Sequence, residues 1–259
     1  MCGRYVIASP PEVMRHFFRY AGQPNFPARY NVAPTQPVPV VVEDTGGARS
    51  FELMRWGLLP AWLKDPRGFP LMINARSETI LEKAAFRNAI RRRRCLLPAD
   101  GYYEWQASGS HKQAYFIYPR EGGPFGFAGI AETWTGPNGE EVDTVAIVTA
   151  QSSPDLAVLH QRAPIVIAPD DFDRWLDCRS GDAREILPLL QPPAQHAFAW
   201  HPVSAAVNRV SNDDPRLIEP LTEEALAREV EASAPKQTRV QRVSHPPVAK
   251  VDQGQGSLF

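Results

Sequence analysis

A cysteine stands at the second position of the chain, directly after Met1. Loss of Met1, which a small second residue favours, would give Cys2 a free α-amine beside its thiol. Such a 1,2-aminothiol captures aldehydes: the amine forms an imine, and the thiol closes onto the same carbon to give a five-membered thiazolidine. This closure is intramolecular and therefore has a high effective molarity. Cys2 thus predicts aldehyde chemistry, and the alternative is an unimportant cysteine near a frayed terminus.

Two further side chains are suited to proton transfer. Glu104 lies in a strand that is otherwise rich in aromatic residues, Tyr102, Tyr103 and Trp105. A carboxyl group among aromatic rings tends to have a raised pKa, which suits a proton donor or acceptor near neutrality. His160 lies between a helix end and a strand, and histidine is the usual proton shuttle at physiological pH. The alternatives are a solvated glutamate on an outward face and a structural histidine.

Asn74 and Arg76 follow the apolar pair Met72-Ile73. An amide and a guanidinium in this position suit recognition of a phosphate or a sugar. The alternatives are that Asn74 satisfies the backbone of a turn and that Arg76 pairs with Glu78.

Arginine and aromatic residues elsewhere favour a nucleic-acid surface. A basic patch could follow phosphates, and an aromatic loop could stack on bases or end a base stack. Alternatively, the arginines form a solvated helix end and the aromatic loop is part of a small satellite core. The residues concerned are Arg4, Arg29, Arg87 and 91–94 for the patch, and Trp56, Trp62 and Phe69 for the loop.

Many short strands are expected to position these groups, at 3–7, 38–42, 51–56, 95–97, 101–105, 115–118, 125–131, 142–149 and 198–202. Short helices are expected at about 10–20, with Ser9 as the N-cap, and near 86–93, 169–176, 182–190 and 222–231. The sequence contains no internal repeat. The mixture predicts an α+β fold, a single domain with a strongly bent, mostly antiparallel sheet or open barrel that is flanked by short helices.

The composition excludes several classes of protein. A net charge of −1 over 259 residues gives no overall attraction to nucleic acid or membrane, so any nucleic-acid site must be a local patch. Three scattered cysteines, Cys2, Cys95 and Cys178, predict neither a disulfide framework nor a zinc site and suit a reducing cytoplasm. We find no signal-peptide pattern and no apolar run of about 18 residues. The chemistry calls for no metal and no other cofactor.

Taken together, several blocks of sequence resemble the SRAP family, the SOS-response-associated proteins that process abasic sites in DNA. In chain order they are Met1–Tyr5, Arg29–Thr35, Arg55–Pro60, Asn74–Thr79, Arg94–Trp105, His160–Pro164, and Val207–Asn208 with Asn212–Asp213. The resemblance implies a SRAP-like catalytic domain over residues 2–232. Residues 233–259 are rich in Pro, Gln, Ser, Gly and Lys, and we expect them to form a disordered tail.

The resemblance also implies roles for individual residues. Cys2 falls at the crosslinking position, and Asn74, Glu104 and His160 fall at the other active-site positions. The expected DNA-binding residues are Arg4 and Arg76 at phosphate-contact positions, Thr149 near the reacting sugar, and Trp56, Trp62 and Arg162. One position departs from the family pattern, because Ala163 stands where the His-x-Arg-Met-Pro block usually has Met. We expect this change to alter the packing behind His160 more than the chemistry.

The function that follows is covalent capture of the ring-opened abasic sugar in single-stranded DNA, which shields the lesion during replication and repair. A junction with duplex DNA is a further setting in which we expect this capture. Glu104 would keep the amine of Cys2 unprotonated, His160 would assist ring opening, and Asn74 would hold the sugar and the Cys2 backbone. We expect lyase-type activity with self-processing of Met1. A bacterial, cytoplasmic monomer at the nucleoid and replication forks is expected.

Two other functions remain as alternatives, a peptidase or amidohydrolase with Cys2 as its N-terminal nucleophile, and a non-catalytic DNA-binding module. The near-neutral charge argues against the second. A separate prediction concerns the tail, where Gln255–Phe259 resembles the bacterial sliding-clamp-binding peptide, with Gln255, Leu258 and Phe259 as its main residues. The alternative there is a chance match.

Overall fold

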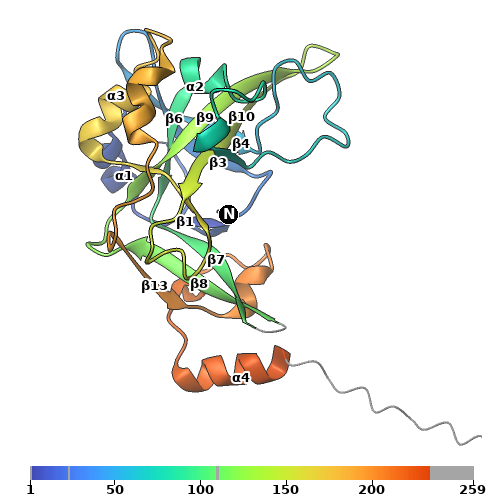
Figure 1. The fold of residues 1–259 in the computed structure, drawn as a ribbon, viewed down its shortest axis with the longest axis vertical. Coiled ribbons are helices and arrows are strands. Elements are labelled where there is room, and N and C mark those ends of the chain that lie inside the picture. The colour runs from blue at the N-terminus through green and yellow to red at the C-terminus, as the bar shows by residue number, and fades with distance from the viewer. Residues whose placement is uncertain (1, 23, 109–110, 234–259) are drawn as a thin grey trace, which may run out of the picture.

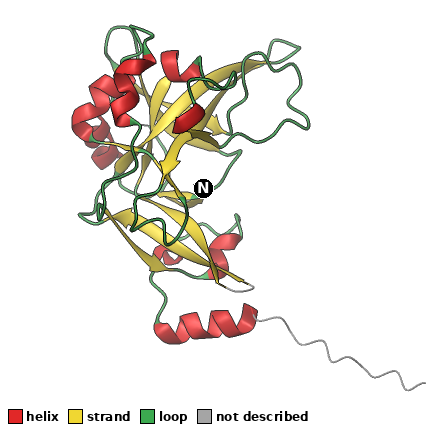
Figure 2. Ribbon diagram, viewed as in Figure 1, coloured by secondary structure: helices red, strands yellow, loops and turns green. Residues whose placement is uncertain are grey.

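Strands make up most of the fold that the computed structural model describes, and the helices are short and lie outside the sheets (Figures 1 and 2). The described residues are 2–22, 24–108 and 111–233. Met1 and the predicted clamp-binding peptide at 255–259 lie outside them, so the tail predictions stay untested. No helix in the described part of the chain is long and apolar enough to cross a membrane.

The first sheet has five antiparallel strands in the order β13-β8-β7-β1-β2. Its strands are β1 (Tyr5–Ile7), β2 (Arg29–Val32), β7 (Gly101–Ser108), β8 (His111–Pro119) and β13 (Phe198–Pro202). The short strand β1 lies between β7 and β2, so the start of the chain is held from both sides.

The second sheet curls into a closed barrel, because β9 pairs with β6 on one side and with β10 on the other. The barrel strands are β3 (Pro37–Glu43), β4 (Arg49–Trp56), β6 (Arg94–Ala99), β9 (Phe125–Thr135) and β10 (Glu141–Gln151). Three short strands extend it: β5 (Asn74–Arg76) and β11 (Arg162–Pro164) pair with β10, and β12 (Val166–Ile167) pairs with β9. Only the pairs of β10 with β4 and with β5 are parallel.

The predicted α+β class with a mostly antiparallel sheet is therefore confirmed, and the bent sheet proves to be a barrel with a second sheet beside it. Helices and turns of 3-10 helix fill the connections. They are α1 (Pro11–Phe18), η1 (Ser77–Thr79), α2 (Ala89–Arg92), η2 (Pro169–Asp171), α3 (Phe172–Leu176), η3 (Ala183–Leu189), η4 (Ala205–Asn208), η5 (Pro215–Ile218) and α4 (Glu223–Ser233).

Strand β1 is buried on both of its faces. Tyr5 and Ile7 belong to the main core, where the Tyr5 ring meets Trp56 edge-on at a centroid distance of 5.3 Å. Val6, which points the other way as strand geometry requires, packs in a smaller core with Tyr103 and Val207. The two cores thus fix the strand that follows Cys2.

The prediction that Ser9 caps the first helix is wrong. Helix α1 begins after Pro10, and no side chain caps it. Ser9 instead donates through its hydroxyl to Asp100, whose other carboxylate oxygen accepts the amides of Ala8 at 2.6 Å and Ser9 at 2.8 Å. Asp100 therefore fastens the end of β1 to the turn between β6 and β7.

Closure of the barrel depends on the absence of a side chain at Gly129 in β9. A Cβ atom there would lie 2.3 Å from Leu97 Cδ1 and 2.7 Å from Cys95 Sγ. We expect Gly129→Ala to lower the free energy of unfolding by about 2 kcal/mol, the usual scale of overpacking in a core. Gly126→Ala in the same strand is the matched control, since its Cβ would come no closer than 3.0 Å to another atom. Urea unfolding measures both, and equal midpoints would contradict this account of the barrel.

Candidate active site

Cys2 lies before β1, separated from it by Gly3 and Arg4, and Asn74, the first residue of β5, holds it in place. The Asn74 side-chain amide donates to the Cys2 carbonyl oxygen at 2.9 Å, across 72 residues of sequence. The other atom of that amide, Asn74 Oδ1, is buried and has no hydrogen-bond donor among the described residues. It is therefore available to accept a hydrogen bond from a bound molecule.

Trp56 supports Asn74 from behind. Its indole Nε1 donates to the Ile73 carbonyl at 3.0 Å, and the Ile147 amide of β10 donates to the same oxygen at 3.0 Å. The Trp56 ring has no exposed surface. The prediction that Trp56 stacks on DNA is therefore wrong, because the ring is enclosed in the core and fixes the backbone next to Asn74.

Glu104 approaches Cys2 from the neighbouring strand β7. Tyr5 of β1 pairs with Tyr102, and the Tyr103 amide donates to the Arg4 carbonyl at 3.0 Å. Continuing this register places Glu104 opposite Gly3, next to Cys2. The Glu104 side chain is 3% exposed, and burial raises the pKa of its carboxyl group, an effect that the nearby charge of His160 opposes. Glu104 is thus a buried carboxyl group whose charge responds to its neighbours.

The thiol of Cys2 is also buried, and this keeps it protonated. Burial is the main cause that raises its pKa, and the negative charge of Glu104 raises it further, while a hydrogen bond from the Arg4 backbone has the opposite effect. At neutral pH, Cys2 therefore presents a thiol rather than a thiolate.

His160 reaches the site from the turn before β11. The Arg162 amide, which can only donate, lies 3.0 Å from His160 Nδ1. The Arg162 carbonyl oxygen, which can only accept, lies 3.1 Å from the same nitrogen. Nδ1 therefore accepts from the amide when it carries no proton and donates to the carbonyl oxygen when it does, so the Arg162 backbone holds the ring in either tautomer. Ala163, the position that departs from the family pattern, is buried in the main core. Its effect on the orientation of His160 stays a prediction.

Arg162 is held in an ion pair that the sequence did not indicate. Its two terminal nitrogens lie 3.0 and 2.9 Å from the carboxylate oxygens of Glu78, and Nη2 also donates to the Thr149 carbonyl at 2.7 Å. The alternative that Glu78 pairs with Arg76 is therefore wrong. Thr149 is buried and its hydroxyl lies 3.3 Å from Arg162 Nε. DNA contacts by Thr149 and Arg162 stay predictions.

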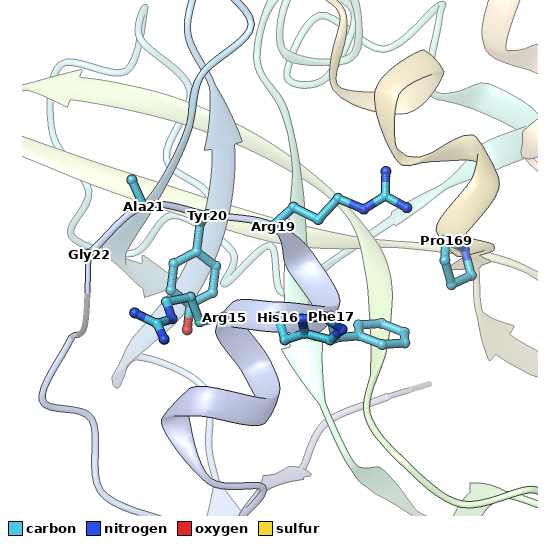
Figure 3. Close-up of a pocket in the computed structure, with 8 residues that line it drawn as sticks. All are labelled: Arg15, His16, Phe17, Arg19, Tyr20, Ala21, Gly22 and Pro169. Carbon is cyan, nitrogen blue, oxygen red and sulfur yellow. The ribbon is translucent and has the colours of Figure 1, made fainter.

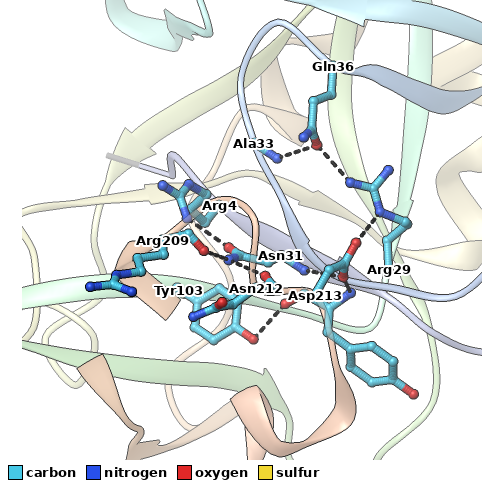
Figure 4. A network of polar contacts seen from close by, with 10 residues as sticks. Arg4, Arg29, Asn31, Ala33, Gln36, Tyr103, Arg209, Asn212 and Asp213 are labelled. Carbon is cyan, nitrogen blue, oxygen red and sulfur yellow. Dashed lines mark hydrogen bonds and ion pairs between the residues drawn. The ribbon is translucent and has the colours of Figure 1, made fainter. Parts of the chain in front are cut away.

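The other predicted DNA contacts differ in their exposure and in the partners that their side chains already have. The Arg76 side chain is exposed and makes no ion pair or hydrogen bond within the described ranges. Arg4 is half-buried, and its side chain donates to the Asn31 side-chain oxygen at 2.8 Å (Figure 4). It also donates to the Val207 carbonyl at 2.8 Å, so both of its acceptors within the described residues are neutral oxygens. The Trp62 ring is 57% exposed and meets Phe69 edge-on.

A separate hollow of about 900 Å³ lies on the outer side of α1 (Figure 3). Arg15, His16, Arg19 and Tyr20 line it together with Pro169. None of the predicted site residues lines it, so it is distinct from the group around Cys2.

The fold and this group of residues define a class of protein in which a cysteine at the start of the chain meets an amide, a buried carboxyl group and an imidazole. A sequence model described as "SOS response associated peptidase (SRAP)" matches residues 1–210, and the chain belongs to this family.

The relatives agree along most of the chain. The abasic site processing protein YoqW of Bacillus subtilis is 33% identical over 223 residues, which are 85% of this chain and 99% of that protein. The abasic site processing protein HMCES of Gallus gallus is 34% identical over 236 residues, covering 79% of this chain and 69% of that protein. A crystal structure of a Bacteroides thetaiotaomicron protein superposes with a TM-score of 0.77 at 23% identity, over 85% of this chain and all of the other, a likeness in fold alone.

The buried carboxyl group predicts a dependence of stability on pH. Because the pKa of Glu104 is raised on folding, the folded protein keeps this proton to a higher pH than the unfolded chain does. The free energy of unfolding should fall as pH rises from about 4.3, the unfolded value, through the folded pKa. Glu104→Gln cannot titrate and should remove that fall, so that its free energy of unfolding exceeds that of the wild type at pH 8 and differs little from it at pH 4.

Urea unfolding at the two pH values measures this difference. Glu141→Gln, at the exposed end of β10, is the control and should follow the wild type. If Glu104→Gln also follows the wild type at both pH values, the carboxyl group is not destabilised by burial.

Proposed function

We propose that this protein processes abasic sites in DNA by capturing the aldehyde of the ring-opened sugar on Cys2. The observation that supports this most is the fixed position of Cys2, with Asn74 bound to its carbonyl and Glu104 next to it. The relatives named abasic site processing protein point in the same direction. Single-stranded DNA is the substrate we expect, because an abasic nucleotide there has no stack to leave.

The two nucleophiles of Cys2 are its thiol and its α-amine, and their protonation states determine which of them reacts first. The Cys2 thiol is protonated at neutral pH, whereas an α-amine with a pKa of about 8 loses its proton readily to a carboxylate such as Glu104. The amine therefore attacks the aldehyde carbon first, and loss of water gives the imine. The S–H bond then adds across the C=N bond: sulfur joins carbon, and the proton goes to nitrogen.

Asn74 and His160 act on the sugar in this scheme. Asn74 Oδ1 is buried and has no donor among the described residues. It accepts a hydrogen bond from a hydroxyl group of the sugar, while Nδ2 donates to the Cys2 carbonyl. His160 donates a proton to the ring oxygen as the sugar opens, and the Arg162 backbone holds its ring through Nδ1. No step in this sequence needs a metal ion.

Phosphate binding rests on arginines whose charge is not already balanced. Arg4 and Arg76 have no carboxylate partner within the described part of the chain, whereas Arg162 pairs with Glu78 and Arg29 with Asp213. A phosphate gains most from an unpaired guanidinium. Arg4 and Arg76 are therefore the phosphate contacts we propose, with Trp62 as the exposed aromatic group.

A peptidase that uses Cys2 as a thiolate nucleophile is the less favoured function. The family description includes the word peptidase, but amide hydrolysis by cysteine requires a thiolate, and burial with Glu104 nearby raises the pKa of the Cys2 thiol. We propose the removal of Met1 as the only processing step that the aldehyde chemistry requires.

Cys2 and its amine should both be necessary for the adduct. Mixing the protein with a single-stranded oligonucleotide that carries one abasic site should give a species that survives heating, with the mass of protein plus DNA minus water. Cys2→Ala should form no adduct without a reducing agent, because an imine alone hydrolyses. Protein that retains Met1 should fail as well, since its Cys2 nitrogen is an amide. Intact mass reports Met1 removal and adduct formation together.

Cys178→Ala is the matched control, because Cys178 is a free, partly exposed cysteine beside α3. It should react like the wild type. Equal yields of unreduced adduct from Cys2→Ala and the wild type would exclude the thiazolidine.

Arg76→Gln should weaken binding to single-stranded DNA and lower the dependence of log K on log salt by about 0.7, the contribution of one phosphate contact. Arg67→Gln is the control, since Arg67 is equally exposed but pairs with Asp65. Fluorescence anisotropy at several salt concentrations measures both variants. Identical slopes for Arg76→Gln and the wild type would exclude Arg76 as a phosphate contact.

A further inference from the structure

We propose that Asn31, in β2, is a positioning residue through which the C-terminal part of the domain holds Arg4 in place for phosphate. This inference rests on the proposed function, because Arg4 matters here as a contact to the DNA next to the reacting sugar. Asn31 lies in a different segment of the chain from Cys2, Asn74, Glu104 and His160, and the fold brings it into contact with Arg4.

Asn31 is completely buried, and its side-chain amide is used at both ends. Oδ1 accepts from Arg4 Nη1 at 2.8 Å, and Nδ2 lies 3.1, 3.0 and 2.8 Å from the carbonyl oxygens of Val207, Arg209 and Asn212 (Figure 4). A side-chain amide offers an acceptor oxygen and two N–H donors from one small planar group. An aspartate would face three carbonyl oxygens with a negative charge, and a leucine would leave them without a donor.

The backbone of Asn31 is fixed to the same loop. Asp213 accepts the Asn31 amide at 3.1 Å and the Tyr30 amide through one carboxylate oxygen, and it pairs with Arg29 through the other. Arg29 in turn donates to Gln36 at 3.0 Å. Residues 207–213 are thus bound to β2 by side chains from both partners, and Asn31 lies at the centre.

This arrangement leaves Arg4 positioned but not neutralised. Its Nη1 is shared by two neutral oxygens, those of Asn31 and Val207, and no carboxylate pairs with it among the described residues. A guanidinium has five N–H donors, so the remaining ones stay available for an anion. The Arg4 side chain is half-buried, so the cation is partly removed from water, and this lowers its pKa. A phosphate at this position would meet a preorganised, unbalanced charge.

The contacts continue from the loop to the last described helix. Glu229 of α4 accepts the Ser204 hydroxyl at 2.8 Å and the Ala205 amide at 3.0 Å, at the start of η4. The carbonyl oxygen of Val207, in the same short helix, accepts a hydrogen bond from Arg4. Hydrogen bonds through η4 therefore link α4 to Arg4, which is only two positions from Cys2.

The experiment is a double-mutant cycle on the full chain. Single-turnover adduct formation with abasic single-stranded DNA gives a half-saturating DNA concentration and a maximal rate. Asn31→Leu should raise the half-saturating concentration about tenfold and change the maximal rate by less than about threefold. In an Arg4→Ala background the same substitution should have almost no further effect, because coupled residues are not additive.

Glu229→Ala tests the other end of the link with a partly exposed residue whose loss leaves the cores intact. It should raise the half-saturating concentration about two- to threefold, and this effect too should vanish with Arg4→Ala. Glu231→Ala, exposed on the same helix, is the matched control and should behave like the wild type.

Additive effects in either cycle, equal behaviour of Glu229→Ala and Glu231→Ala, or a loss confined to the maximal rate would each overturn the inference. The same cycles are measured by anisotropy with Cys2→Ala proteins, which need no crosslink. A wild-type protein that forms no adduct would therefore overturn the proposed function alone, while the binding cycles still decide the role of Asn31.

Discussion

The main physical constraint on this protein is that Cys2, close to the start of the chain, must be held in one position. The hydrogen bond from the Asn74 amide to the Cys2 carbonyl provides this restraint. A terminal residue has a neighbour on one side only, so its restraint has to come from other elements. Here β1 lies between β7 and β2 and is buried on both faces, and Asn74 of β5 binds the carbonyl of Cys2, three residues before Tyr5. The barrel serves this contact, since β10 and Trp56 hold β5 in place.

The same burial that orders the terminus sets its chemistry. It raises the pKa of both the Glu104 carboxyl group and the Cys2 thiol. A carboxyl group with a raised pKa is a better base for an ammonium, and a thiol with a raised pKa stays protonated until an electrophile is beside it. In the proposed mechanism, one physical cause therefore favours the amine as the first nucleophile and delays the sulfur. The charges of Arg162 and Arg29 are balanced by carboxylates, whereas no carboxylate among the described residues pairs with Arg4.

Local patterns in the sequence were enough to predict the class of fold and most of the strands, because alternating apolar residues and turn residues act over short distances. They also marked Cys2, Asn74, Glu104 and His160 as candidates by their residue types, and the resemblance to the SRAP family joined these candidates into one predicted site. Trp56 was misassigned because an aromatic residue before a loop has the same pattern whether it is buried or exposed. Asn31, Glu78 and Asp213 were missed as positioning residues because their partners lie 27 to 184 residues away, and no local pattern encodes such pairs. Closure of the barrel depends on the pairing of β9 with β10, which alternation alone does not reveal.

The loop that holds Arg4 also gives the protein an order of assembly. Val207 follows Arg4 by 203 residues, and a ribosome adds roughly 5 to 20 residues per second. For about 10 to 40 s the first residues of each new chain therefore exist without the carbonyl oxygens that later fix them. During synthesis the first strands therefore wait for residues 204–213, and Arg4 gains its hydrogen bond to Val207 only after this late segment has packed against β2.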